Sequence, residues 1–210
     1  MQEVRRPAFI YLDLGRVVVD FDHGLAWSKI AALTGLSTSA VEQFFTSADR
    51  PQRMETGLLA WAELHADFAS EFGTDVDVET LARAAGDIFT LRTEMLPVIS
   101  AIERARVPLG ILSNTCDPHW QHLLRCRYGI LPGGLGPLVL SHEVGAMKPH
   151  RRIYDVAAEK AGVAPESIFF CDDIPAHVDA AREAGWDAEV FVGAATLIKQ
   201  LADRGVRMSL

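Results

Sequence analysis

The chain has 210 residues, 49% of them hydrophobic, which is enough for one sizeable core or for a core with a small insert. Its formal net charge of −8 argues against a nucleic-acid-binding protein, which needs a basic surface, and against binding to an anionic membrane. The sequence lacks the apolar stretch of a signal peptide and any apolar run near the roughly 20 residues of a membrane span. Three cysteines without CxxC spacing indicate reduced thiols. We therefore expect a cytoplasmic protein with no nucleic-acid or membrane partner.

The first predicted element is a strand over residues 8–14, AFIYLDL, in which apolar residues run directly into Asp13. A continuous apolar run of this length is typical of a strand that is buried on both faces of a parallel sheet. Residues 23–95 differ, because four successive segments have the spacing of helices and no strand signal separates them. We therefore expect a module of about four helices after the first strand.

Strands and helices then alternate to the end of the chain. A helix that begins near Pro97 leads into the second strand, and two later helical segments end at Gly162 and Gly185. The further strands are predicted over residues 108–114, 136–141, 167–173 and 188–193. This alternation predicts an α/β fold with a doubly wound, Rossmann-like parallel sheet. The predicted domains are a discontinuous core of residues 1–18 and 97–210 and an inserted four-helix cap of residues 19–96.

Polar residues end three of the predicted strands. They are Asp13, Ser113, Asn114, Asp172 and Asp173. Lys148 lies in a loop just before the helix that precedes the strand ending in the two aspartates. Because the carboxyl ends of parallel strands form the ligand-binding crevice of an open sheet, we expect all of these side chains to converge there.

The converging residue types suit phosphoryl transfer. Asp13 and Asp173 can hold Mg²⁺, which takes few carboxylates and keeps several waters. Lys148 offsets the charge of a phosphate, and Ser113 and Asn114, with the amides around them, are expected to bind phosphate oxygens. A carboxylate can also act as a nucleophile and form an aspartyl phosphate. Phosphoryl transfer needs mainly positioning and charge neutralisation, and this set supplies both.

Four segments in chain order resemble the motifs of the haloacid dehalogenase-like hydrolase superfamily. They are DLGRV from Asp13, LSN with Ser113, GAMKPHRRIY with Lys148 and FFCDD ending at Asp173. The resemblance covers essentially the whole chain, and the helical insert looks like the four-helix cap of that family. It implies that Asp13 is the nucleophile and a metal ligand. It also implies metal ligation by Asp173 and by the backbone carbonyl of Gly15, and phosphoryl binding by Ser113 and Lys148.

Gly15 departs from the family pattern. Most phosphatases of the superfamily have a second Asp here, which serves as general acid for the leaving group and then as base for water. General acid–base help is worth roughly 10²–10⁴ in rate. Three alternatives follow: a substrate with a good leaving group, such as an anomeric or acyl phosphate, a proton donor elsewhere, or a catalytically weak protein. The candidate donors are His23, Asp22, Asp117 and His119.

The pattern DLGxVxVDxD, from Asp13 to Asp22, is similar to one branch of the superfamily. Its best-known member is a bacterial phosphatase acting on α-D-glucose 1-phosphate. An anomeric phosphate has a better leaving group than an alkyl phosphate, which agrees with the first alternative. We therefore predict a Mg²⁺-dependent phosphatase of a small phosphorylated metabolite, with sugar 1-phosphates favoured. His177 stands where the family often has Asn or Asp, which affects the hydrogen bonds around Asp173.

Other functions remain open on the same residues. A 2-haloacid dehalogenase would use the same nucleophile without a metal, and the pair Asp172–Asp173 argues against it. A phosphomutase would need an acid–base residue at position 15. A binding or regulatory protein of low activity is favoured by Gly15 and His177. The cap is expected to read the leaving group near Asp22–His23 and in the turn of residues 53–57, and its aromatic residues would allow a homodimer.

Overall fold

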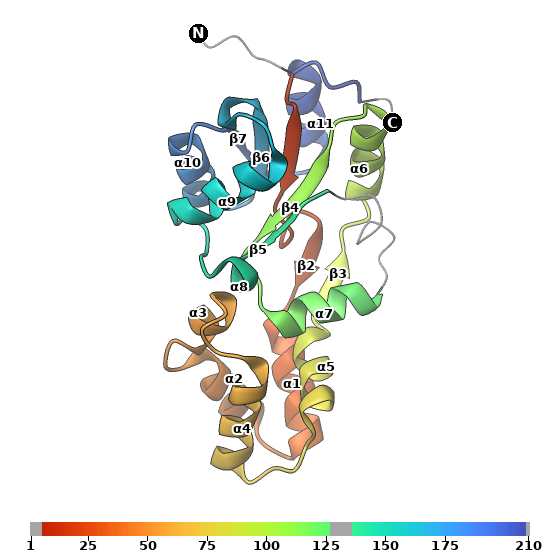
Figure 1. The fold of residues 1–210 in the computed structure, drawn as a ribbon. Coiled ribbons are helices and arrows are strands. Elements are labelled where there is room, and N and C mark those ends of the chain that lie inside the picture. Colours follow the sequence, from red (N-terminus) through yellow and green to blue (C-terminus); the bar gives the residue numbers. More distant parts are fainter. Residues whose placement is uncertain (1–5, 127–135, 209–210) are drawn as a thin grey trace.

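The computed structural model describes residues 6–126 and 136–208, so parts of the predicted core domain (1–5, 127–135 and 209–210) lie outside it. Its centre is a five-stranded sheet in the order β5-β4-β1-β6-β7, with every strand pair parallel (Figure 1). The strands are β1 (Phe9–Leu12), β4 (Leu109–Ser113), β5 (Leu138–Leu140), β6 (Ile168–Asp172) and β7 (Asp187–Val190). Each overlaps a predicted strand, and the predicted α/β fold class is confirmed.

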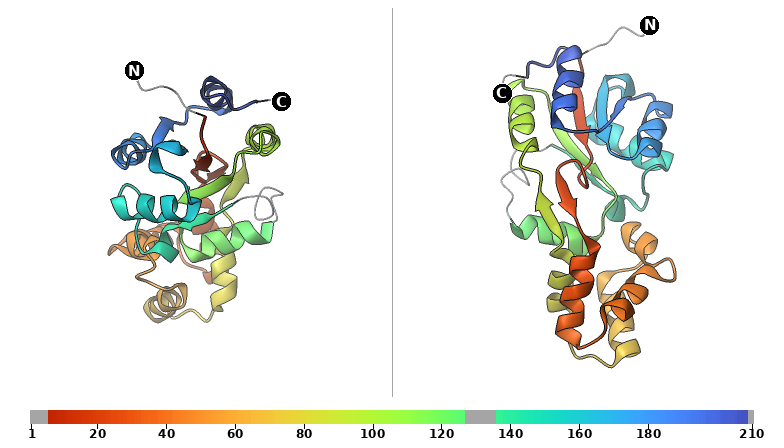
Figure 2. Two further views of the ribbon diagram at one scale, coloured as in Figure 1. Left: turned by 45° about the horizontal axis from the view of Figure 1, so that its top comes forward. Right: turned by 180° about the vertical axis from the view of Figure 1, so that it is seen from behind.

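Helices cover both faces of this sheet (Figure 2). The covering helices are α6 (Met95–Arg104) and α11 (Ala194–Asp203) on one face, and α9 (Arg151–Ala161) and α10 (Pro175–Glu183) on the other. Side chains of β1 pack alternately on the two faces of the sheet. Ile10 and Leu12 belong to one apolar cluster, and Phe9 and Tyr11 belong to the other. Burial on both faces is the reason why this strand is a continuous apolar run.

Between β1 and β4 the chain forms a bundle of helices at one end of the sheet (Figure 1). The bundle helices are α1 (His23–Thr34), α2 (Thr38–Thr46), α3 (Arg50–Glu55), α4 (Trp61–Phe72) and α5 (Val78–Gly86). They enclose an apolar cluster of their own, in which Leu64 and Phe68 are fully buried and Phe72 is packed against them. None of the helices in the described part of the chain is long and apolar enough to cross a membrane.

Three further elements follow or precede strands of the sheet. They are α7 (Asp117–Cys126) after β4, α8 (Ser141–Val144) after β5 and the 3₁₀ turn η1 (Pro165–Ser167) before β6. Helix α7 contacts α5, and α8 contacts α3, so these two elements of the sheet region adjoin the bundle (Figure 1).

The sequence analysis missed two features of the insert. Helix α3 has only six residues, none of them buried, and so short a segment carries no clear periodic signal. Strand β3 (Phe89–Leu91) pairs antiparallel with β2 (Val19–Phe21), whereas a helical pattern was predicted to run through Phe89. Helix α5 ends at Gly86 instead. The two short strands carry the chain into and out of the bundle.

The apolar cluster of the bundle is separate from the two clusters that flank the sheet. This is the arrangement that a core of residues 1–18 and 97–210 with a cap of residues 19–96 requires. The division into these two domains stays a prediction.

Replacing Phe68 by Ala is expected to lower the free energy of unfolding by about 3–5 kcal/mol, because the cavity left in the bundle lies among three other phenylalanine rings. Urea unfolding followed by circular dichroism measures the loss. The matched control is Phe72→Ala at the partly exposed edge of the same cluster, for which we expect a smaller loss. Equal losses at the two positions would contradict this assignment of the bundle core.

Candidate active site

The polar strand ends meet at the end of the sheet that faces the bundle (Figure 1). Asp13 follows β1, Ser113 ends β4, and Asp172 ends β6 with Asp173 directly after it. Strand β1 lies between β4 and β6, so the three ends are neighbours in space. One carboxylate oxygen from each of Asp13, Asp172 and Asp173 lies within 4.8 Å of the others. The convergence expected from the sequence is therefore present.

Lys148 lies at the centre of this cluster. Its Nζ donates to Asp13 Oδ1 at 2.7 Å, to Asp172 Oδ2 at 2.6 Å and to the carbonyl of Leu112 at 3.0 Å. Burial alone would lower the pKa of the ammonium, but the two carboxylates outweigh burial and raise it. Lys148 therefore stays charged although its side chain is almost completely buried.

The three carboxylates carry more negative charge than the single ammonium of Lys148 can balance. Burial raises the pKa of Asp13 to about 6, although Lys148 acts in the opposite direction. Burial and the neighbouring Asp172 also raise the pKa of Asp173. Three carboxylates around one ammonium form an oxygen-rich, net negative group, and this is the kind of site that a hard divalent cation such as Mg²⁺ fits.

Asp172 is completely buried and uses both of its oxygens. Besides accepting from Lys148, it accepts from the backbone N–H of Ile174 at 2.8 Å, and His177 Nδ1 lies 3.1 and 3.2 Å from its two oxygens. Burial opposes its ionisation, yet Lys148 and His177 hold its pKa below the usual range. The sequence connected His177 with Asp173, whereas the structure places it on Asp172. Asp172 thus anchors Lys148 and leaves Asp173 as the carboxylate available to a metal.

The loop after β4 is fixed by side chains. Asn114 Oδ1 accepts from the backbone N–H of Lys148 at 2.8 Å, and its Nδ2 donates to the carbonyl of the same residue at 2.9 Å. Ser141 Oγ accepts from the N–H of Thr115 and donates to its carbonyl. Ser113 is buried at the start of this loop. Asn114 therefore positions Lys148, and its predicted contact with substrate stays a prediction.

Gly15 has little room for a side chain. A Cβ there would lie 2.9 Å from Cε1 of Phe21, a residue of β2. The guanidinium of Arg16 covers the same ring, 4.5 Å from its centroid, and Phe89 packs against the ring edge. Phe21 thus takes the space in which the second Asp of the family pattern would begin. Sequence spacing does not show this, because the contact depends on the β2–β3 pair that the sequence analysis missed.

A cavity of about 60 Å³ opens beside this cluster. It is lined by Leu14, Gly15, Phe21, His23, Glu55, Ile88, Phe89, Ser113, Asn114, Thr115 and His119. Backbone and side chains from the sheet side and from the bundle therefore contribute to one site.

Two of the four predicted proton donors reach this cavity. His23 and His119 line it, with ring centroids 5.8 Å apart. Burial lowers the pKa of both imidazoles, that of His119 to about 3, so both are neutral at pH 7. Asp22 instead caps α1 by accepting from the N–H of Gly24 at 2.8 Å. Asp117 accepts from a side chain one turn later in α7, at 3.2 Å.

Glu55 is the acidic residue that the sequence analysis did not single out, although it lies within the expected contact segment of residues 53–57. It ends helix α3 and lines the cavity together with Gly15. Burial raises the pKa of its carboxyl, while Lys148 and His177 act in the opposite direction. Its position depends on Gly57, which has φ of +71° and whose Cβ would lie 2.3 Å from the carbonyl oxygen of His142 in α8. Only glycine allows this close approach of the two backbones.

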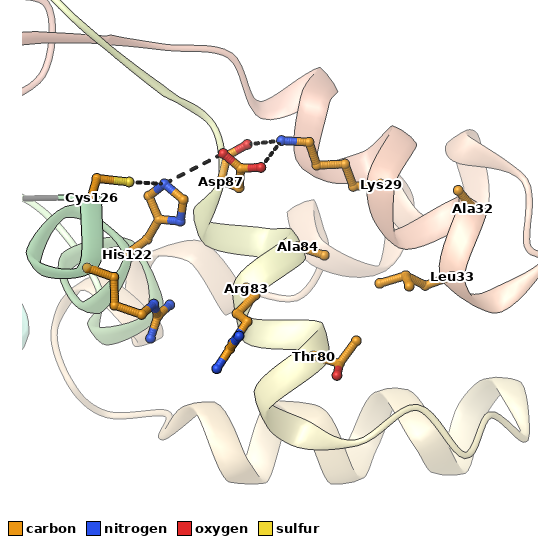
Figure 3. A pocket seen from close by; sticks show the side chains of 10 residues that line it. Lys29, Ala32, Leu33, Thr80, Arg83, Ala84, Asp87, His122 and Cys126 are labelled. Atoms are coloured by element: carbon orange, nitrogen blue, oxygen red, sulfur yellow. Dashed lines mark hydrogen bonds and ion pairs between the residues drawn. The ribbon is translucent and has the colours of Figure 1, made fainter.

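A second hollow, of about 600 Å³, lies between α1, α5 and α7 (Figure 3). There His122 Nε2 lies 3.0 Å from Cys126 Sγ and 3.6 Å from Asp87 Oδ1, and Asp87 is paired with Lys29. A catalytic Cys–His–Asp arrangement needs the thiol and the carboxylate on opposite ring nitrogens. Here the same nitrogen meets both, so we assign this group no catalytic role.

The model of the haloacid dehalogenase-like hydrolases matches residues 8–185, which is most of the chain. The chain belongs to this hydrolase family. The superfamily expected from the four motifs is thereby confirmed.

Two curated proteins and one solved structure are similar to this chain. It is 25% identical over 186 residues to a phosphatase of Mycobacterium tuberculosis, covering 85% of this chain and 84% of that protein. It is 26% identical over 156 residues to a flavin mononucleotide hydrolase of Arabidopsis thaliana, covering 74% of this chain and 62% of that protein. A solved haloacid dehalogenase family enzyme of Bacteroides thetaiotaomicron, in complex with magnesium and inorganic phosphate, has a TM-score of 0.72. It is 22% identical and covers 86% of this chain and 92% of its own, which shows a shared fold.

Asp13→Asn is expected to stabilise the metal-free protein above pH 6. The folded-state pKa of Asp13, about 6, lies above its unfolded value, so its ionisation favours unfolding as the pH rises through this range. We expect the variant to be more stable than the parent by about 2–3 kcal/mol at pH 8 and similar to it at pH 4.

Urea unfolding in the presence of EDTA at the two pH values measures the difference. Asp179→Asn on the exposed surface of α10 is the control, and we expect no such pH-dependent gain from it. A variant of Asp13 that is less stable than the parent at pH 8 would contradict the assignment.

Proposed function

We propose that this hydrolase cleaves phosphoric monoesters of small metabolites through an aspartyl phosphate on Asp13. The observation that carries the proposal is the contact of Asp13 with Lys148 at 2.7 Å, within a cluster of three carboxylates beside the cavity lined by Ser113. Nucleophile, counter-charge and hydrogen-bond donors are thus assembled in one place, as phosphoryl transfer requires.

Mg²⁺ is the proposed cofactor. Asp13, Asp173 and the backbone carbonyl of Gly15 would hold it, while Lys148 and His177 keep Asp172 away from it. When bound, the ion supplies the charge that neutralises the phosphate and aligns it with the attacking carboxylate. A phosphate dianion would otherwise meet a net negative site. The magnesium and phosphate in the Bacteroides family member support this assignment.

The side chains of this chain carry two displacement steps. In the first, Asp13 forms a bond to phosphorus while the bond from phosphorus to the leaving-group oxygen breaks. In the second, water attacks the same phosphorus, which releases inorganic phosphate and restores the carboxylate. Lys148 keeps Asp13 ionised and offsets phosphate charge, while Ser113 and the amides of its loop bind phosphate oxygens.

We assign the proton transfers to Glu55. It is the carboxyl group that lines the cavity together with Gly15, and burial raises its pKa, as suits a group that must both give and take a proton. The two neutral histidines are weaker donors at this pH, because their pKa values are lowered by burial.

The substrate is a small phosphorylated metabolite whose leaving group departs readily. Sugar 1-phosphates, favoured by the sequence pattern of the glucose 1-phosphate branch, are one such class. The curated relatives are named for a phosphatase and for flavin mononucleotide hydrolysis, which supports the reaction type and leaves the substrate class open. The cytoplasmic location, the homodimer and the lack of nucleic-acid and membrane partners stay predictions.

We expect Mg²⁺-dependent phosphate release from a panel of phosphorylated metabolites, and Asp13→Asn is expected to reduce kcat by about 10³-fold or more because it removes the nucleophile. The assay compares Mg²⁺ with EDTA, and Asp179→Asn is a surface control. A folded protein that binds Mg²⁺ and turns over no compound would overturn the proposal in favour of a binding role. Halide release from 2-haloacids without metal would favour a dehalogenase.

Glu55→Gln is expected to lower kcat by about 10²-fold for a phosphate with a poor leaving group, such as glycerol 3-phosphate, because protonation of that group is then required. For acetyl phosphate, whose leaving group needs little help, we expect a much smaller loss. The matched control is Glu42→Gln, whose side chain lines only the neighbouring pocket. A similar loss in both variants would count against Glu55 as the proton donor.

A further inference from the structure

A larger pocket, of about 370 Å³, adjoins the catalytic cavity on the bundle side. The two share His23, Glu55 and His119 as lining residues. A molecule with its phosphate beside Ser113 can therefore place the rest of its structure in this pocket. The volume lies in the usual range for small-ligand sites.

Aromatic rings form one wall of this pocket. Trp27 stacks on His23 at a centroid distance of 5.9 Å, Phe45 stacks on Trp27 at 5.3 Å, and Trp61 stacks on Phe45 at 6.1 Å. The angles between successive ring planes are only 15°, 21° and 16°, so the rings form a nearly parallel row. Such a row offers ring faces and edges to another flat ring.

Apolar side chains make up much of the rest of the lining, and none of its described residues is a lysine or an arginine. Met54, Cys116 and four alanine or proline side chains of the bundle and α7 region add apolar surface, and Thr46 adds a hydroxyl group. Among the described residues, the charged side chains that line the pocket are Glu42 and Glu55, both acidic. The two histidines are neutral at pH 7, because burial lowers their pKa values. An anionic group would meet like charge here, whereas an uncharged flat ring would bury its apolar surface against the aromatic wall.

We infer that the substrate is an aryl phosphate whose uncharged, flat aromatic leaving group lies against the row of Trp27, Phe45 and Trp61. This inference rests on the proposed phosphatase function and names the substrate class of the same site. It places sugar 1-phosphates, which the sequence favoured, second.

The chemistry of an aryl ester agrees with the glycine at position 15. When Asp13 bonds to phosphorus, the bond between phosphorus and the aryl oxygen breaks and its electron pair leaves with that oxygen. A phenolic oxygen carries this charge better than an alkoxide does, so it needs less proton help in the transition state. It takes its proton from Glu55 or from water as the product leaves.

Three aryl phosphates of similar leaving ability separate recognition by the pocket from intrinsic reactivity. We expect kcat/KM for 2-naphthyl phosphate to exceed that for phenyl phosphate by about tenfold, mainly through KM, because the second ring adds stacking. We expect 4-carboxyphenyl phosphate to be about tenfold worse than phenyl phosphate, because its anion faces the two glutamates. Glucose 1-phosphate and acetyl phosphate complete the panel.

Trp61→Leu is the diagnostic variant, because its ring ends the row and is partly exposed. We expect it to raise KM for 2-naphthyl phosphate about tenfold and to affect KM for acetyl phosphate much less, since that substrate has no ring. The matched control is Phe72→Leu, which changes an aromatic side chain of the bundle outside the pocket. We expect it to change KM for neither 2-naphthyl phosphate nor acetyl phosphate. Circular dichroism verifies that both variants are folded.

Preference for glucose 1-phosphate over both neutral aryl esters would overturn the inference and leave the phosphatase intact. Equal effects of Trp61→Leu on acetyl phosphate and 2-naphthyl phosphate would do the same.

If no compound shows turnover that depends on Asp13, the proposed function fails. Calorimetric titration with 2-naphthol in the presence of inorganic phosphate then tests the pocket alone. Binding that Trp61→Leu weakens about tenfold supports the aromatic preference, and no binding overturns it.

Discussion

The contact of Lys148 with Asp13 and Asp172 is the interaction on which the site depends. The buried ammonium lies 2.7 and 2.6 Å from the two carboxylates. It lowers the pKa of both acids, which burial alone would raise. Removing Lys148 would leave two buried carboxylates without a counter-charge, which is far more destabilising than the loss of an exposed ion pair. Two further contacts hold the three groups in position. Asn114 accepts a hydrogen bond from the backbone N–H of Lys148, and His177 lies against Asp172. Charge balance and geometry are therefore secured by the same few residues.

Much of the sheet side was predictable from the sequence, for a physical reason. Strands buried on both faces are continuous apolar runs, and polar residues at their carboxyl ends have one place to converge. The convergence of Asp13, Ser113 and Asp173 follows from this rule, and the fold class with it, whereas Lys148 lies in a loop and was expected there from its motif. The order of the strands around β1 keeps these ends adjacent.

The bundle side was less predictable, because its contribution depends on tertiary contacts. Helix α3 is too short and too polar to show a period, yet it places Glu55 at the cavity. The β2–β3 pair has three residues in each strand, too few for an alternating pattern to be recognised, yet it places Phe21 over Gly15. The stacking of Trp27, Phe45 and Trp61 joins three helices, which no local pattern reveals.

The β2–β3 pair is also the route by which the chain enters and leaves the bundle (Figure 1). Asp13 and Lys148 lie on one side of this two-strand connection, while Glu55 and the row of rings lie on the other. The close approach of Gly57 to the backbone of His142 is a second contact between the bundle and the sheet region. The proposed proton donor and the proposed substrate-binding wall therefore belong to the same part of the chain. A displacement of the bundle on this two-strand connection would move Glu55 and the row of rings together, away from Asp13.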